Sequence, residues 1–178
     1  MGFSSTTGTA TRAKREWKRW YAGMTMFLAS YTNGVDKKGR VSVPASFRTE
    51  LAHHSRPGVV VYAAPEEQYL YAWGYDDFTK FAETIKKMPP LAPERQRLAR
   101  TLLAAARPLN FDDNGRIMLP ETFLNHTGIT EKALFAGQGD YFTIWNPDRY
   151  EQIQAADQAH YTDDITLLSE GWSQQHDG

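Results

Sequence analysis

Two short segments of the sequence carry the residues best suited to bind a polyanion. Residues 36–44 read D-K-K-G-R-V-S-V-P, and residues 112–120 read D-D-N-G-R-I-M-L-P. Both contain Asp-x-x-Gly-Arg, followed by two alternating apolar residues and a proline. An Arg guanidinium is a planar fork of N–H donors that can meet a phosphate or the O6/N7 edge of guanine. We therefore predict that Arg40 and Arg116 contact nucleic acid.

The Asp and Gly of each segment indicate a tight turn that supports the arginine. An Asp side chain accepts backbone N–H bonds within a turn, and glycine takes up positive φ at no steric cost. We predict that Asp36 and Gly39 form the first turn and that Asp112 and Gly115 form the second. A structural alternative is that each Arg pairs with its own Asp in a buried ion pair that holds the turn, and the two roles are compatible.

The residues between Asp and Gly differ in charge between the two segments. Lys37 and Lys38 add positive charge to the first turn, whereas Asp113 and Asn114 stand at the same places in the second. Phosphate binding depends on basic side chains. We expect the first turn to be the stronger polyanion site and the second, with Asn114 beside its arginine, to be weaker or more selective.

Two alternative chemistries use the same or nearby residues. Asp36 and Asp112 could share one proton, as the paired carboxylates of aspartic proteases do, but the neighbouring Lys and Arg residues would favour ionised carboxylates. The pair His53-His54 lacks a second ligand pair at a spacing that suits zinc. The sequence also lacks a phosphate loop, G-x-S-x-G and H-E-x-x-H. We predict no catalytic residue, no metal and no cofactor.

An internal repeat places the two segments in two copies of one unit. Beyond the shared Asp-x-x-Gly-Arg motif, further matches follow in the same order in both copies. They are Phe47 with Phe123, Tyr69–Trp73 (Y-L-Y-A-W) with Tyr141–Trp145 (Y-F-T-I-W), Asp76 with Asp148, and Phe78 with Tyr150. Trp73 and Trp145 are expected to be core or interface anchors.

Hydrophobic periodicity predicts short strands and helices within each copy. Alternation and β-branched residues indicate strands, and proline marks the beginning or end of helices. The predicted strands are 27–32, a short one with Val41 and Val43, 58–63, and its hairpin partner 69–73; the predicted helices are 45–51, 76–88, 94–106, and one from 148 that fades into a polar, acidic end.

The helix over 94–106 carries its basic and apolar residues on opposite faces. Its apolar face is formed by Leu98, Leu102 and Ala105. The opposite face holds Arg95, Arg97 and Arg100, for which solvent or a subunit contact is the default expectation and nucleic acid the alternative.

Composition and charge fit a globular protein with a basic beginning and an acidic end. Hydrophobic residues make up 41% and charged residues 23%, with no cysteine, which excludes disulfides and thiolate metal sites. Residues 1–26 hold five Lys and Arg against one Glu, and residues 147–178 hold seven Asp and Glu against one Arg. No segment has the roughly 18 apolar residues that a membrane helix needs. We therefore expect no membrane association.

The expected organisation has five parts. Residues 1–25 form a basic, disordered arm. In one interpretation the arm binds phosphates; in the other, translation naturally starts at Met24 or Met26 and the arm is an artefact of the chosen start site. The remaining parts are a first repeat over 26–77, a helical linker over 78–104, a second repeat over 105–150, and a helix with an acidic tail over 151–178.

These residues resemble the MraZ family. The resemblance is carried by M-F-L-A-S-Y-T-N-G-V-D-K-K-G-R-V-S-V-P-A-S-F-R from Met26, by the second D-x-x-G-R-I-M-L-P, and by P-E-R-Q-R-L-A-R-T-L-L between them. It covers about residues 26–150. One copy alone would indicate only the wider AbrB/SpoVT-like group.

The resemblance implies an α+β, mainly β fold: an AbrB-like double-split (swapped-hairpin) β-barrel formed by the two repeats, with accessory helices. It further implies a ring-shaped homo-oligomer in the cytoplasm and nucleoid that binds repeated promoter boxes in double-stranded DNA, upstream of the cell-division and cell-wall gene cluster, as a transcriptional regulator. The family's DNA-binding turn corresponds here to Lys37, Lys38 and Arg40, with Asn114 and Arg116 in the second copy. An antitoxin-like or scaffolding module is the competing function.

Overall fold

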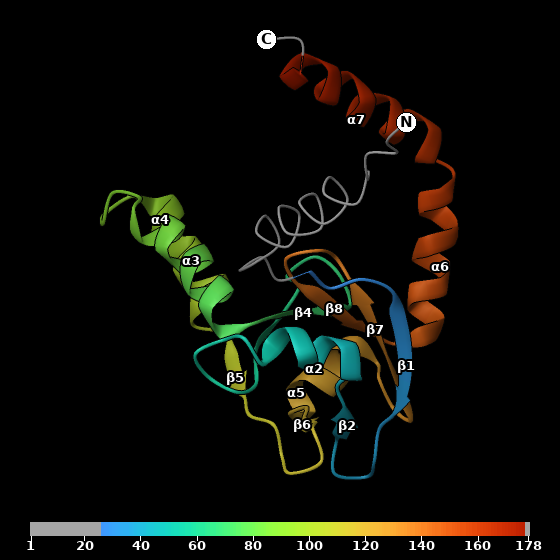
Figure 1. The fold of residues 1–178 in the computed structure, drawn as a ribbon. Helices are drawn as coiled ribbons and strands as arrows, with labels where there is room; N and C mark the ends of the chain where they lie inside the picture. The colour runs from blue at the N-terminus through green and yellow to red at the C-terminus, as the bar shows by residue number, and fades with distance from the viewer. Residues whose placement is uncertain (1–25, 177–178) are drawn as a thin grey trace, which may run out of the picture.

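The computed structural model describes residues 26–176, so the predicted arm over 1–25 lies outside the described residues. These residues form an α+β fold built on an antiparallel six-stranded sheet, with strand order β1-β7-β8-β4-β3-β5, and a separate two-stranded ribbon of β2 and β6 (Figure 1). The strands are β1 (Ser30–Gly34), β2 (Arg40–Ser42), β3 (Val59–Ala63), β4 (Tyr69–Trp73), β5 (Arg107–Leu109), β6 (Arg116–Met118), β7 (Lys132–Gly137) and β8 (Phe142–Trp145).

Short helices separate the strands and longer ones follow each copy. The helices are α2 (Ala45–Leu51), α3 (Tyr75–Lys86), α4 (Pro93–Leu98), the π-helical segment η1 (Ala99–Leu103), α5 (Glu121–Thr127), α6 (Pro147–Gln158) and α7 (Tyr161–His176). The predicted α+β class is confirmed, and so are the helix at 45–51 and the hairpin of β3 with β4.

The two copies exchange strands. β1 of the first copy pairs with β7 of the second, and β5 of the second pairs with β3 of the first. At the centre of the ribbon Val41 pairs with Ile117, and at the centre of the sheet Tyr71 pairs with Thr143. Each of these pairs joins equivalent positions of the repeat, so the two copies are related by an approximate two-fold axis.

The core lies between one face of the sheet and a layer formed by α2, α5 and the ribbon. Phe27, Phe47 and Phe142 meet at its centre, with ring centroids 4.9–5.2 Å apart, and all three side chains are buried. Because residues alternate between the faces of a strand, Leu70 and Ala72 of β4 face this core. The predicted alternation of Val41 and Val43 is confirmed, since both are fully buried.

The opposite face of the sheet carries a layer of aromatic rings. Tyr69 stacks on Trp145 at 4.2 Å, and Trp73 stacks on Tyr141 at 4.6 Å and on Phe81 of α3 at 5.3 Å. Helices α3 and α6 begin from this layer and extend away from the sheet in different directions (Figure 1). Trp73 and Trp145 therefore anchor the packing of the sheet, as expected.

Three predicted elements differ from the structure. The strand expected at 27–32 begins only at Ser30, because Ala29 has a positive φ of 67°. Phe27 turns into the core, and its backbone forms hydrogen bonds with that of Gly139. The helix expected over 94–106 is α-helical only to Leu98 and then widens into η1. The helix expected to fade after 148 ends at Gln158, and a further helix, α7, follows.

Candidate nucleic-acid interface

The two Asp-x-x-Gly-Arg turns have the same hydrogen-bond pattern. In the first, the Asp36 carboxylate accepts from the backbone N–H groups of Lys38 and Arg40, both at 2.9 Å. In the second, Asp112 accepts from the N–H groups of Asn114 and Arg116 at 2.9 and 3.0 Å. In each turn the Gly N–H also donates to the Asp carbonyl. Each aspartate carboxylate therefore accepts two backbone N–H groups of its own turn.

The glycines allow the two turns to lie side by side. Gly39 and Gly115 have φ values of 77° and 71°, as predicted. The Gly39 carbonyl accepts from the N–H of Leu119 at 2.9 Å, and the Gly115 carbonyl accepts from the N–H of Val43 at 3.2 Å. Each turn is thus bonded to the strand that leaves the other turn, and both project from the same end of the molecule (Figure 1).

This cross-bonding predicts a large stability loss for Gly39→Ala. A Cβ at Gly39 would lie 2.7 Å from the Leu119 carbonyl oxygen, in addition to the strain of a positive φ. Gly139→Ala is a matched control, because Gly139 has a φ of 83° but nothing within 4 Å of its Cβ position. Denaturant unfolding should show a loss of about 1–2 kcal/mol for the control, from φ strain alone, and a clearly larger loss for Gly39→Ala. Equal losses would show that the two turns are not packed as described.

The guanidinium groups of both turns are held by one nitrogen. Arg40 Nε donates to Asp36 Oδ2 at 2.6 Å, and Arg116 Nε donates to Asp112 Oδ2 at 2.8 Å. The arginine side chains are 36% and 29% exposed. Within residues 26–176, the terminal nitrogens Nη1 and Nη2 of both groups have no hydrogen-bond partner. The expected Arg–Asp pairs are therefore present but not buried, and the forks remain able to bind a ligand.

The same contacts lower the pKa of both aspartates. The backbone N–H of Arg40, together with its guanidinium, lowers the pKa of Asp36 to about 2. The pKa of Asp112 is lowered by the equivalent groups of Arg116. A proton-sharing carboxylate dyad instead needs one raised pKa. The electrostatics of the turns therefore do not suit the aspartic-dyad chemistry that the repeated Asp suggested.

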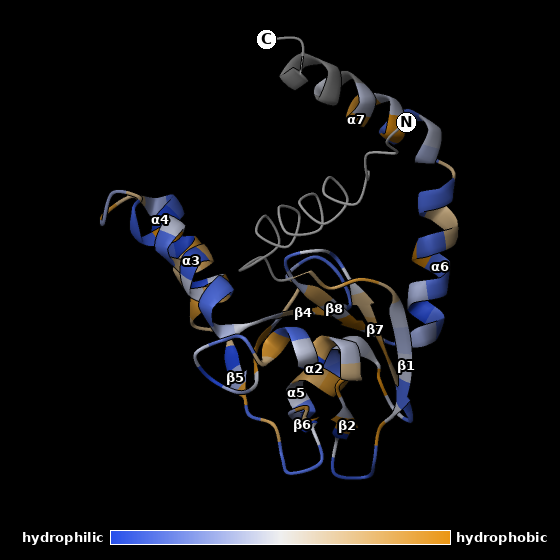
Figure 2. Ribbon diagram, in the orientation of Figure 1, coloured by the Kyte–Doolittle hydropathy of each residue, from blue (hydrophilic) through white to orange (hydrophobic). Residues whose placement is uncertain are grey.

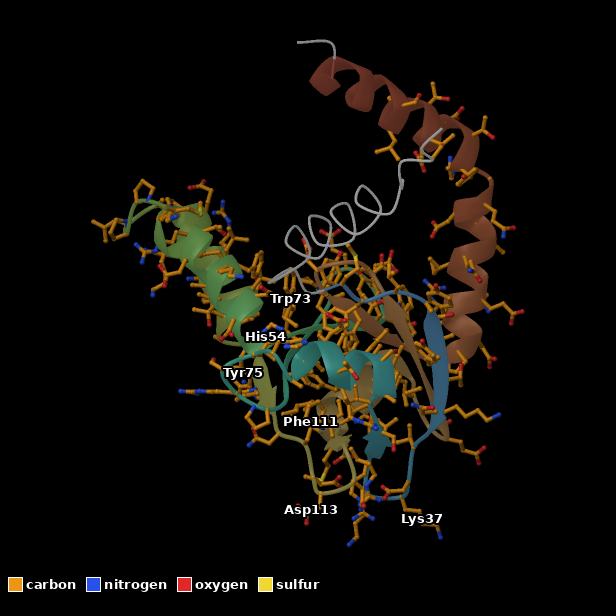
Figure 3. The ribbon with its side chains drawn as sticks, viewed as in Figure 1. Lys37, His54, Trp73, Tyr75, Phe111 and Asp113 are labelled. Atoms are coloured by element: carbon orange, nitrogen blue, oxygen red, sulfur yellow. The ribbon has the colours of Figure 1, made fainter. Side chains whose placement is uncertain are left out.

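The tips of the turns are hydrophilic and differ in charge as the sequence indicated. Lys37 and Lys38 are exposed on the first turn, and Asp113 and Asn114 are exposed on the second. Lys37 and Asp113 lie at neighbouring loop ends (Figure 3). Figure 2 shows that both loops are among the hydrophilic parts of the ribbon. Arg40 and Arg116 stand where each turn enters the ribbon of β2 and β6.

Sequence reasoning did not identify Arg48 of α2 as part of this end of the molecule. Its Nη1 donates to the Val43 carbonyl at 2.7 Å. Its side chain lies against the second turn, since a Cβ at Gly115 would be 2.7–3.0 Å from its Cδ, Nε and Cζ atoms. Comparison of the two copies could have identified Arg48. The equivalent residue of the second copy is Leu124, which packs against Gly39 of the first turn as Arg48 packs against Gly115 of the second.

Other residues considered from the sequence have structural roles. The His54 side chain is only 4% exposed, and its Nδ1 accepts from the N–H of Asp76 at 3.2 Å. In the described part of the chain, no group of three or more His, Cys, Asp or Glu residues is placed to hold a metal. Arg95 donates to the Met88 carbonyl, and Arg97 pairs with Glu94. No helix among these residues is long and apolar enough to cross a bilayer.

The fold and the two turns define an internally duplicated α+β protein with paired guanidinium-bearing turns at one end. The family model of the MraZ protein, whose description also likens the family to antitoxins, matches residues 26–101 and again residues 102–166. The chain belongs to the MraZ family.

Relatives of this chain include proteins named transcriptional regulator MraZ. The one from Rickettsia canadensis (strain McKiel) is 37% identical over 145 residues, which cover 81% of this chain and 97% of the relative. The one from Rickettsia akari (strain Hartford) is 36% identical over the same shares. The one from Pelagibacter ubique (strain HTCC1062) is 40% identical over 129 residues, 72% of this chain and 83% of the relative.

Proposed function

We propose that this protein is a sequence-specific DNA-binding transcriptional regulator that uses the two turns as its DNA contacts. The observation that carries this proposal is the pair of half-exposed guanidinium groups, held by Nε on adjacent turns with their terminal nitrogens unpartnered among residues 26–176. Such a fork matches a guanine edge or a phosphate. The names of the relatives support the same function.

Each turn residue has a role that follows from its chemistry. Arg40 and Arg116 read a base edge or clamp a phosphate, and the ion pair with Asp36 or Asp112 fixes their direction. Lys37 and Lys38 neutralise phosphates near the first turn. Asn114 offers an amide that can bond an adenine edge. The first turn supplies affinity through charge, and the second supplies selectivity.

Affinity then depends on assembly. One turn neutralises too few phosphates to bind well alone, and repeating it in a ring-shaped homo-oligomer adds contacts at high effective concentration. The exchanged strands support an AbrB-like double-split barrel as the unit of that ring. Among the described residues, β1 and β5 are the edge strands of the six-stranded sheet, and their outer edges are surfaces through which strands can associate. The proposed target is a set of repeated boxes upstream of the cell-division and cell-wall gene cluster, and the proposed location is the cytoplasm and nucleoid.

A footprint on the DNA upstream of the protein's own gene tests this function. The expected result is regularly spaced protection that weakens steeply between 50 and 200 mM salt, because each phosphate contact releases counterions. A DNA of equal length from inside a coding region is the control. Protection that is uniform along both DNAs would contradict sequence-specific binding.

An antitoxin-like or scaffolding module remains the second candidate, and one feature of the structure favours it. Helix α7 exposes Tyr161, Leu167 and Leu168, with 63–67% of each residue accessible, and exposed apolar groups on a helix can bind a protein. A folded protein that gives no footprint at either salt concentration would favour this candidate over the regulator.

A further inference from the structure

We propose that Arg48 forms, with Tyr31 and Ser46, a third binding site for a DNA phosphate, beside the second turn. This inference rests on the proposed DNA-binding function and adds a site to it. The three residues line a pocket of about 450 Å³ between β1, β2 and α2. Its lining contains no Asp or Glu, so nothing acidic in it opposes an anion.

Among the described residues, Arg48 differs from the two turn arginines because it has no carboxylate partner. Arg40 and Arg116 each form an ion pair with an aspartate. Within residues 26–176, the Arg48 side chain makes one hydrogen bond, from Nη1 to the Val43 carbonyl, and no ion pair. A guanidinium has five N–H donors, so most of its donors and its full charge remain for a ligand. Burying a cation without a counter-ion costs free energy. A bound phosphate would supply the missing negative charge.

The hydroxyl groups at the pocket complete a donor set for a phosphate oxygen. Ser46 Oγ donates to the Tyr31 hydroxyl at 3.2 Å, which leaves the tyrosine proton free to point elsewhere. Ser and Tyr hydroxyls and Arg are common partners of DNA phosphates. The pocket thus offers one positive charge and one neutral hydroxyl donor, the chemistry that suits a phosphodiester.

The exchange of strands places this cation beside the second turn, which lacks the positive charge that Lys37 and Lys38 give to the first turn. Arg48 belongs to the first copy, but its side chain lies against Gly115 of the second turn, next to Asp113 and Asn114 in the sequence. In the second copy the position of Arg48 is taken by Leu124, and that of Ala45 by Glu121. The site is therefore present once per chain, and it offsets the acid that weakens the second turn.

The test compares the salt dependence of DNA binding for the wild type, Arg48→Gln and Arg48→Lys. The probes are the duplex protected in the footprint and a scrambled duplex of the same length. Removing a phosphate contact should lower the slope of log K against log salt by about 0.9 per engaged copy and weaken binding at least about tenfold at low salt. The loss should be similar on both duplexes, and Arg48→Lys should keep the slope because it keeps the charge. Arg97→Gln on α4 is the matched control.

An unchanged slope and affinity for a folded Arg48→Gln would overturn the inference and leave Arg48 with its structural bond to Val43. If Arg48→Gln melts well below the wild type, the double variant Tyr31→Phe/Ser46→Ala tests the same pocket: a several-fold loss of affinity supports it, and unchanged affinity overturns it. Failure of the proposed function gives a different result, because the wild type itself would then not bind the protected duplex.

Discussion

Replacing Arg40 with Ala should abolish promoter binding while the protein stays folded. A well-placed bidentate contact to a base contributes about 1–3 kcal/mol, or about 5- to 150-fold in affinity. An assembly that uses several copies of the turn loses this contribution at each copy. A gel shift with the promoter duplex should therefore show no complex at concentrations that saturate the wild type.

The fold should tolerate this change because the turn does not depend on the guanidinium. The Asp36 carboxylate still accepts from the backbone N–H groups of Lys38 and Arg40, and the Gly39 N–H still donates to the Asp36 carbonyl. The lost ion pair is half-exposed and open to solvent screening, and surface pairs of this kind contribute about 0–1 kcal/mol. Arg97→Ala removes an exposed ion pair on α4 and serves as the control for both melting and binding. An Arg40→Ala protein that unfolds, or that binds like the wild type, contradicts the assigned role.

Cutting the chain between the two copies should leave neither half folded as a monomer. Separate fragments 26–91 and 92–176 would each keep one hairpin, β3 with β4 or β7 with β8. The pairs β1 with β7, β2 with β6, β3 with β5, and β4 with β8 would all be lost. An isolated hairpin is marginally stable at best. Circular dichroism with denaturant should show no cooperative transition for either half at low concentration.

Mixing the two halves should restore the native fold, because the cut lies beside Leu91, which is 86% exposed. The approximate two-fold axis also allows one half to pair with a second copy of itself. Folding of a single fragment should therefore appear only with dimer formation, which sedimentation can detect. A fragment that unfolds cooperatively as a monomer would show that the exchanged strands are not required.

The short helices, strands and turns could be predicted because the residues that specify each of them lie next to one another in the sequence. Pro44 precedes α2, the apolar run after Gly58 is a buried strand, and the Asp and Gly of each motif specify a turn whatever lies around it. The same reasoning identified Arg40 and Arg116 as the residues at the mouths of the turns. Their half-exposed ion pairs show the structural role that the sequence left open, and their terminal nitrogens leave the proposed binding role possible.

The exchange of strands could not be predicted from the residues alone, because each strand could pair within its own copy or across copies with the same hydrophobic pattern. The contact of Arg48 with Gly115 depends on that exchange, so its relation to the second turn was missed. The late start of β1 depends on the positive φ of Ala29, an uncommon conformation for alanine. The widening of the linker helix into η1 has no signal that we recognise in the sequence.

Photo-crosslinking from the turn tips tests most directly whether they face DNA. A photoreactive residue is placed at Lys37 or at Asp113, and at Leu91 between α3 and α4 as the control. Each protein is then irradiated on the promoter duplex. If the turns bind DNA, the first two positions crosslink to the protected boxes and Leu91 does not. Crosslinks from Leu91 with none from either turn would contradict the account.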